Sequence, residues 1–406
     1  MSFHYSFPSP EIGRIRSIRR DPVITMVSTY PPKLCGLATF AAALEDQLIA
    51  TGAVVKMVRI DDGDEVTTPG PTQLMATRRR PIATLVNGDR VSIRNAAFAL
   101  SQGDVAIVQH EYGIYGGPDG DEVIALLTGI TIPVIVTLHT VPLHPNDRQR
   151  ALLSQISGLC DRLVVMTNAA HARLIAGYDV DPSKVIVIPH GAWTAGASSE
   201  LPTRLPAIAP TLLTWGLIGP GKGIEHVIGA MRLLRDLESG PRYVVAGVTH
   251  PKVIAQQGDS YRQSLIAFAQ STGVDTSVHF DATYRDRVTL GAFVAAATVV
   301  VLPYDSRDQV TSGVLVDAIA AGRPVVATAF PHAVELLGSG AGIIVPHEDP
   351  RAIASAIRSI LTDQAVYLAM QAEAAEVAQS FSWSTVAKAY ASVSDQLMAL
   401  PKPVAV

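Results

Sequence analysis

Short apolar runs recur along the chain and alternate with longer segments of helical character. Because the runs are continuously apolar rather than alternating, they are typical of strands buried on both faces, as in parallel sheets. In the first half they cover residues 23–27, 54–60, 105–108, 134–138, 163–166 and 185–188. In the second half they cover residues 211–215, 243–246, 278–280, 299–302, 324–327 and 342–345. The pattern predicts two parallel sheets of six strands.

Helical segments separate these runs, so each half repeats the strand–helix–strand order of a doubly wound α/β domain. We expect helices over residues 39–50, 169–176, 224–237 and 314–321. A stretch rich in Pro, Ala and Ser, residues 194–210, has no periodicity and is typical of a linker. We therefore predict a first domain over residues 1–195, a second over 196–380, and a tail over 381–406 whose helix packs on either domain.

Composition narrows the functional classes. Of the 406 residues 48% are hydrophobic and 17% are charged, and the net charge is −4, so nothing indicates a nucleic-acid partner. Arg78, Arg79 and Arg80 form a basic run, which is either a solvated loop or a contact for a polyanionic substrate or lipid surface. The two cysteines, the lack of an apolar leader and the lack of an apolar run of about 18 residues predict a cytoplasmic protein without a transmembrane segment.

Glycine-containing loops follow the first and seventh predicted strands, at the sheet edge where ligands of such domains bind. Gly36 opens the first helix, with Thr39 as a candidate N-cap, and the amides there can face an anion. The loop of residues 216–223 contains Gly219 and Lys222 and is close to the P-loop pattern. Gly223 lacks the hydroxyl that binds magnesium in NTPases, so the loop favours a diphosphate cradle over an NTPase.

A second anion contact is expected after the tenth strand. Ser312 and Gly313 stand where a helix begins, and free amides with the helix dipole favour phosphate there. Asp317, one turn further, is a candidate acceptor for ribose hydroxyls, or else a solvated helix residue.

Histidines also follow strands of the first half. His110, His139, His144 and His190 occupy these positions, which favours contacts with sugar hydroxyls, although a single one of them is equally well a structural histidine. No spacing typical of zinc ligands is present, so we predict no metal site.

Several of these motifs together resemble the retaining glycosyltransferases of family 4, in the GT-B superfamily. They are the Pro31–Gly36 loop, His190-Gly191, the loop around Lys222, the strand leading to Thr328, and Phe381-Ser-Trp383. The resemblance implies an α/β fold of GT-B type. Two Rossmann-like domains would then face each other across a cleft, and a C-terminal helix would cross back to the N-terminal domain.

The resemblance also implies roles for single residues. Lys222, with the loops at Gly36, Gly219 and His190 and the helix start at Ser312, Gly313 and Val314, would hold the donor diphosphate, and Asp317 would bind the ribose. His139 would contact the donor sugar.

Two positions depart from the family pattern. Gln309 stands where the family has the first of two glutamates, and we assign it to the catalytic set with His139 and Lys222. Leu217 replaces an arginine, so either another basic residue such as Arg285 or Arg287 takes its place or donor binding is weaker.

The implied activity is transfer of a hexose with retention of configuration from a nucleotide sugar to a saccharide acceptor. Mg²⁺ is compatible with this scheme but not required. Cys35-Gly36, the 110–114 segment and the 309–313 segment resemble bacterial mannosyltransferases, including those that extend methylated mannose polysaccharides in actinobacteria. GDP-mannose is therefore the favoured donor and UDP-glucose the second. A catalytically silent nucleotide or sugar binder, and a GT-B epimerase or phosphorylase, stay open as alternatives.

Overall fold

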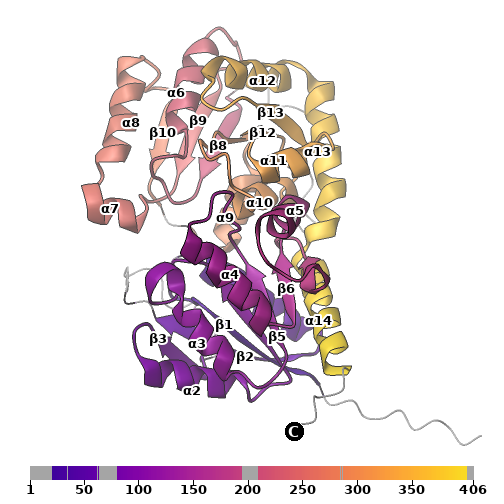
Figure 1. Ribbon diagram of the computed structural model, residues 1–406. Coiled ribbons are helices and arrows are strands. Elements are labelled where there is room, and N and C mark those ends of the chain that lie inside the picture. The colour runs from indigo at the N-terminus through magenta and orange to yellow at the C-terminus, as the bar shows by residue number, and fades with distance from the viewer. Residues whose placement is uncertain are drawn as a thin grey trace, which may run out of the picture.

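The computed structural model describes residues 21–33, 35–61, 63, 80–193, 209–283, 285 and 287–399, which form two α/β domains (Figure 1). The first domain contains seven parallel strands in the order β3-β2-β1-β4-β5-β6-β7. The strands are β1 (Val23–Ser28), β2 (Val54–Asp61), β3 (Ala83–Val86), β4 (Val105–His110), β5 (Val134–Leu138), β6 (Arg162–Val165) and β7 (Val185–Val187). The helices are α1 (Gly36–Ala50), α2 (Arg90–Leu100), α3 (Glu122–Gly129), α4 (Asp147–Leu159) and α5 (Asn168–Gly177), with the short turns η1 (Pro118–Gly120) and η2 (Pro182–Lys184).

The second domain contains six parallel strands in the order β10-β9-β8-β11-β12-β13. They are β8 (Thr211–Trp215), β9 (Arg242–Ala246), β10 (Val278–Asp281), β11 (Val299–Leu302), β12 (Val325–Thr328) and β13 (Gly342–Val345). Its helices are α6 (Ile224–Leu233), α7 (Pro251–Gln257), α8 (Ser260–Ser271), α9 (Arg287–Ala295), α10 (Gly313–Ala320), α11 (Pro331–Leu337), α12 (Pro350–Thr362) and α13 (Gln364–Ala378).

The apolar runs are continuous because both faces of each sheet are covered. In β4, Ala106 and Val108 belong to one core cluster of the first domain, whereas Val105 and Ile107 belong to the cluster on the other face. The residues of β11 divide in the same way between the two clusters of the second domain. Successive side chains of a strand point to opposite faces, so burying both faces requires an apolar residue at every position.

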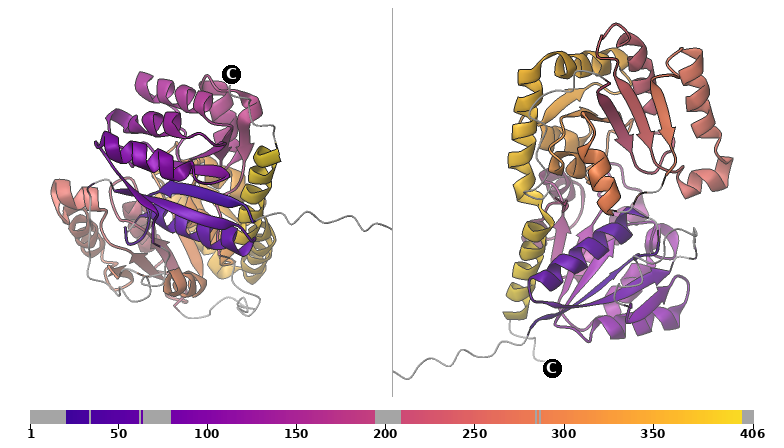
Figure 2. Two further views of the ribbon diagram at one scale, coloured as in Figure 1. Left: turned by 90° about the horizontal axis from the view of Figure 1, so that it is seen from below. Right: turned by 180° about the vertical axis from the view of Figure 1, so that it is seen from behind.

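The chain then returns to the first domain. After α13 and the turn η3 (Gln379–Phe381), α14 (Trp383–Ala399) runs along α1, as Figure 2 shows. Trp383, Val386 and Tyr390 are buried in a cluster with first-domain residues, and the Tyr390 hydroxyl lies 2.9 Å from Thr137 Oγ1. The crossing helix expected from the resemblance is therefore present.

Three details differ from the sequence-based expectations, and two further predictions fall largely outside the described residues. The first sheet has a seventh strand, β3, which is a short, half-exposed edge strand without a continuous apolar run. The first helix begins at Gly36 and its N-cap is Cys35, so Thr39 lies inside the helix. The helix expected to reach residue 237 ends at Leu233. Most of the proposed linker, residues 194–208, and Arg78 and Arg79 lie outside the described residues.

Candidate donor site at the interdomain cleft

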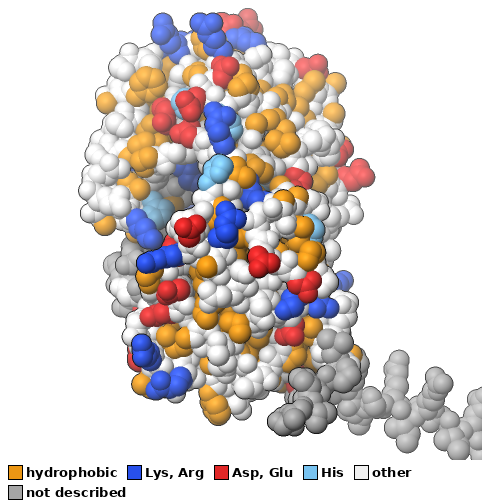
Figure 3. Space-filling model, viewed as in Figure 1, with side chains coloured by type: hydrophobic (Ala, Val, Ile, Leu, Met, Phe, Trp, Pro, Cys, Tyr) orange, Lys and Arg blue, Asp and Glu red, His pale blue; other side chains and the backbone are white. Residues whose placement is uncertain are grey.

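The two sheets place their switch points where ligands of doubly wound domains bind. The strand order reverses between β1 and β4 in the first sheet and between β8 and β11 in the second, so adjacent loops diverge there and leave a crevice. The described residues that the sequence indicated for the donor lie at the ends of strands, on the loops that follow or in the first turns of the next helix. Figure 3 shows the surface hollowed between the two domains, with histidine and basic side chains at the rim.

The loop after β8 carries Lys222 between two glycines whose backbone conformation favours glycine. Gly221 and Gly223 have φ of +83° and +63°, and a Cβ on Gly223 would lie 1.9 Å from the carbonyl oxygen of Pro303. Lys222 Nζ lies 4.4 Å from the centre of the Tyr304 ring, and burial lowers the pKa of this lysine. Among the described residues no carboxylate forms an ion pair with it. The lysine is therefore a partly desolvated cation whose charge is free to bind an anion.

The start of α10 lies beside this loop, since a Cβ on Gly216 would touch Val314 at 4.0 Å. Ser312 is the N-cap, and its hydroxyl oxygen accepts a hydrogen bond from the Leu315 amide. The Ser312 amide donates to His332 Nδ1 at 2.8 Å, so it is not free for phosphate as the sequence suggested. The amides of Gly313 and Val314, in the first helical turn, have no intrahelical acceptor and remain available.

Asp317 lies one turn into α10 and is half-buried. Burial raises the pKa of its carboxyl to about 7. None of the described side chains forms a hydrogen bond or ion pair with this carboxyl. A desolvated carboxyl without partners gains most from a ligand that donates hydroxyl hydrogen bonds to it, which is the role expected of a ribose contact.

His190, at the end of the first domain, lies beside the start of α10. Its Nδ1 donates to the Gly191 carbonyl at 2.8 Å, which leaves Nε2 as the acceptor in the neutral ring. This nitrogen lies 3.0 Å from the position of a Cβ on Gly313, so a side chain at that position would press on the imidazole ring. Burial lowers the pKa of His190 to about 4, and the ring is therefore neutral at pH 7.

His139 approaches the same place from β5. Its Nε2 lies 2.7 Å from Gln109 Oε1, so Nε2 carries the proton and Nδ1 is free to accept. Burial, then His190 and His110, lower the pKa of His139 to about 3. The Phe40 ring contacts both His139 and His190, with centroid distances of 4.8 and 5.0 Å. The structure thus brings together two histidines that are far apart in the sequence.

The remaining sequence candidates take different places. Gln309 is half-buried, and its side-chain amide donates to the Thr311 carbonyl within the same loop. Gly36 is exposed at the first position of α1, with open space around it. Gly219 is buried, and a Cβ there would lie 3.2 Å from Val253 Cγ2, which indicates a packing role. His144 is exposed.

Arg285, one of the two cations expected in place of the missing arginine, has partners within its own domain. Its guanidinium pairs with Asp281 and lies 3.9 Å from the centre of the Phe293 ring. The side chain of Arg287 lies outside the described residues. Lys252 lies on α7, where no sequence motif marks it. Its side chain extends across the cleft to 3.8 Å from a Cβ position on Gly113.

Glu111 lies on the first-domain side of the cleft, near Lys252. Its carboxylate accepts hydrogen bonds from the Thr140 hydroxyl and the Tyr112 amide. Burial is the main cause of the raised pKa of Glu111, and Lys252 opposes it. A carboxylate and an ammonium therefore face each other between the domains.

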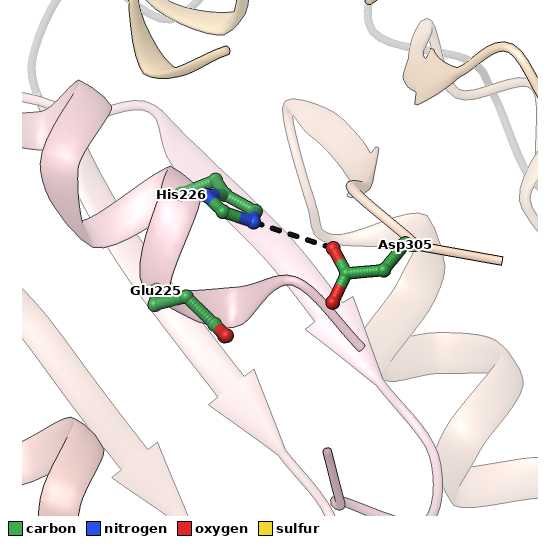
Figure 4. A group of neighbouring side chains, drawn as sticks. All are labelled: Glu225, His226 and Asp305. Carbon is green, nitrogen blue, oxygen red and sulfur yellow. Dashed lines mark ion pairs between the residues drawn. The ribbon is translucent and has the colours of Figure 1, made fainter. Parts of the chain in front are cut away.

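One group of possible metal ligands adjoins the donor loop within the part of the chain that the structure describes. Glu225, His226 and Asp305 offer ligand atoms within 4.8 Å of one another (Figure 4). His226 Nε2 lies 3.3 Å from Asp305 Oδ1, and Glu225 accepts a hydrogen bond from the Tyr261 hydroxyl. These contacts give the three side chains partners within the protein.

Family comparisons agree with this geometry. Residues 36–194 match the model described as "Glycosyltransferase Family 4", and residues 203–377 match "Glycosyl transferases group 1". Among solved structures, a glycosyltransferase from Rickettsia africae has a TM-score of 0.70 at 15% identity, covering 94% of this chain and all of that one. Anabaena HepE in complex with UDP and glucose has a TM-score of 0.69 at 16% identity, covering 92% of this chain and all of that one. At these identities the structures support the fold.

Curated relatives include D-inositol 3-phosphate glycosyltransferases. The protein of that name from Kineococcus radiotolerans is 33% identical over 58% of this chain and 57% of its own length. The one from Catenulispora acidiphila is 30% identical over 62% of this chain and 64% of its own length. The chain thus spans less than two thirds of the length of these relatives. No helix among the described residues is both long and apolar enough to cross a bilayer. The chain thus has the GT-B fold, and its first domain matches a glycosyltransferase family 4 model and its second a glycosyl transferases group 1 model.

Proposed function

We propose that the protein is a retaining hexosyltransferase that takes its sugar from a nucleoside diphosphate donor and transfers it to a saccharide acceptor. One observation carries the proposal. Lys222, a partly desolvated cation without a carboxylate partner, stands at the switch point beside the free amides that begin α10. Asp317, one turn further, is half-buried, and none of the described residues forms a hydrogen bond or ion pair with its carboxyl. A cation, helix amides and a hydroxyl acceptor together match a diphosphate joined to a ribose.

These groups act on the charge that develops as the glycosidic bond breaks. The diphosphate gains negative charge in the transition state, and Lys222 with the Gly313 and Val314 amides stabilises it more strongly than in the ground state. In such a reaction the bond between the anomeric carbon and the diphosphate breaks, and the acceptor oxygen bonds to that carbon on the same face. The departing diphosphate takes the acceptor's proton. Neutral His139 and His190 then bind and orient the sugar, and Gln309 offers an amide to its hydroxyls.

GDP-mannose is the donor that we propose, with UDP-glucose as the alternative. The motifs of the 110–114 and 309–313 segments favour mannose, whereas the Anabaena neighbour was solved with UDP and glucose. The name of the curated relatives adds an inositol phosphate to the acceptors worth testing beside saccharides. Location in a reducing cytoplasm is proposed on the two unpaired cysteines, Cys35 and Cys160.

Thermal shift with GDP, UDP, ADP and their sugar forms tests the donor site. A nucleotide at about 100 times its Kd stabilises the folded state by about 2.7 kcal/mol, which is a readily measured change in melting temperature. A selective shift with GDP supports the mannose donor, and a preference for UDP moves the proposal to glucose. No shift with any nucleotide contradicts the donor site. Binding without turnover over a panel of saccharide and inositol phosphate acceptors favours a silent binder.

Lys222→Ala tests the residue on which the proposal depends. We expect kcat to fall by about a hundredfold or more, the scale for removing one preorganised charge donor. Lys388→Ala on the exposed face of α14 is the matched control and should leave kcat unchanged. Turnover of the Lys222 variant close to the wild-type rate would show that this lysine is not the diphosphate contact.

A further inference from the structure

The backbone of the segment that carries Gln309 is held at three successive carbonyls. Arg173 donates to the Asp308 carbonyl at 2.8 Å, the His332 amide donates to the Gln309 carbonyl at 3.3 Å, and the Thr167 hydroxyl donates to the Val310 carbonyl at 2.9 Å. Arg173 and Thr167 belong to the first domain, whereas residues 308–310 belong to the second. The position of this segment is therefore set largely by the other domain.

Val310 strengthens the same connection by burial. Its side chain is 4% exposed and belongs to a core cluster whose other buried members all come from the first domain. An apolar side chain from the second domain thus completes the core of the first. Moving the Gln309 segment away would expose Val310. It would also break the hydrogen bonds that Arg173 and Thr167 donate to this segment.

One nitrogen of Arg173 links two loops of the candidate site. Besides the Asp308 carbonyl, Arg173 NH1 donates to the carbonyl of Val141 at 2.9 Å. Val141 comes two residues after His139, and Asp308 comes directly before Gln309. The guanidinium therefore fixes the separation of the two loops that carry these candidate catalytic residues.

Glu335 makes a second contact between the two domains. Glu335, on α11, accepts hydrogen bonds from the Asn168 and Ala169 amides at 2.9 and 2.8 Å, at the start of α5. A carboxylate at this end of a helix also interacts favourably with the helix dipole. His332, on the same helix α11, holds Gln309 and Ser312, and α5 carries Arg173. The two domains are thus connected on both sides of the 308–312 segment.

We propose that Arg173 is a positioning residue, which holds the His139 loop and the Gln309 loop at the separation required for sugar transfer. This inference rests on the proposed function, since it assigns a role in the same reaction. The contacts of Arg173 are to backbone carbonyls, and the residues assigned to the nucleotide, Lys222 and Asp317, do not touch it. Loss of Arg173 should therefore slow transfer while nucleotide affinity is kept.

Arg173→Met tests the proposal, because methionine fills much of the same space and donates no hydrogen bond. We expect kcat to fall by roughly ten- to a hundredfold, the cost of a misplacement of about 1 Å between reacting groups. The Kd of the free nucleoside diphosphate, measured by calorimetry, should stay within about twofold of wild type. Because one nitrogen donates both bonds, Arg173→Lys should restore part of the rate.

Hydrogen exchange gives a readout that needs no turnover. In Arg173→Met the amides of residues 308–311 should exchange faster than in wild type, whereas those of α6 and α10 should not change. The control is Arg94→Met, which removes an exposed arginine from α2 and should alter neither exchange nor kcat.

Two results would overturn the proposal. A wild-type kcat in Arg173→Met would show that the separation of the loops does not depend on this residue. If kcat, nucleotide affinity and melting temperature all fell in Arg173→Met, and Arg173→Lys restored none of them, the role of Arg173 would be purely structural. Failure of the proposed function is recognised separately, because wild-type protein would then bind no nucleotide and transfer no sugar.

Discussion

At the scale of single residues, burial decides which groups of the candidate site carry charge. His139 and His190 have pKa values lowered to about 3 and 4, so both are neutral near pH 7 and act as hydrogen-bonding groups. Burial also lowers the pKa of Lys222 and raises that of Asp317 to about 7. Lys222 is therefore a partly desolvated cation, while Asp317, the proposed ribose contact, titrates in the physiological range.

The raised pKa of Asp317 predicts a pH dependence of donor affinity. Below pH 7 the carboxyl of the free protein holds a proton and accepts ribose hydroxyls less well, so binding must first release that proton. With a pKa of about 7, affinity for a nucleotide sugar should fall by about tenfold between pH 8 and pH 6. The two histidines do not titrate in this range.

Isothermal calorimetry with a nucleotide sugar at several pH values measures this effect. A nucleotide sugar is preferable to a free nucleotide because it lacks the second phosphate ionisation near pH 6. Asp317→Asn, which cannot ionise, should show weaker binding at pH 8 and a flatter pH profile. An equally steep profile in this variant would assign the dependence to another group.

At the scale of elements, the loop between β8 and α6 shows how glycine shapes a binding site. Gly223 has positive φ and lies against the Pro303 carbonyl, so the end of β11 restricts the loop from the other side. Gly221 also has positive φ but has open space around it. A side chain at position 221 would therefore cause backbone strain alone, whereas one at position 223 would cause strain and a steric clash.

This pair provides a prediction about the loop. Gly221→Ala should cost only the left-handed strain, about 1–2 kcal/mol, and nucleotide binding should survive. Gly223→Ala adds a clash with the Pro303 carbonyl, so it should lower the melting temperature further and weaken nucleotide binding by tenfold or more. Thermal unfolding and calorimetry of both variants measure the difference. Equal effects of the two substitutions would contradict the close packing of Gly223.

At the scale of the whole molecule, α14 and the residues around it join the two domains. Trp383 contacts Phe40 of α1 at a centroid distance of 5.0 Å, and its ring fills the space that a side chain on Gly191 would occupy. The backbones also pair, because the Ala192 amide donates to Phe381 and the Trp383 amide donates to Ala192. The point where the chain returns to the first domain is thus close to His190 and the cleft.

Trp383→Ala tests this junction. Trp383 is 4% exposed, and truncating a buried aromatic residue of this size costs about 3–5 kcal/mol. We expect the free energy of unfolding from urea titration to fall by that amount. The matched substitution Trp193→Ala, at a position 36% exposed, should cost much less. Similar losses in the two variants would mean that Trp383 is not central to the junction.

The sequence alone was sufficient for the architecture, because a buried parallel strand needs apolar residues at every position. It therefore located twelve of the strands, the glycine-containing loop around Lys222 and the helix that starts at Gly313. It missed β3, since an edge strand such as Ala83–Val86 is covered on fewer sides and has no continuous run. The roles assigned to single site residues remain predictions for the experiments above.

Contacts between distant segments were decided only by the tertiary structure. No local pattern marks His332 as the acceptor for the Ser312 amide, or Arg173 as the donor to Val141 and Asp308. The environment of Asp317 likewise depends on what covers α10 rather than on its neighbours in sequence. The period of apolar residues along the sequence indicates which face of one element is buried. The contacts of His332 and Arg173 and the environment of Asp317 depend instead on which elements meet. The packing of the whole chain decides this.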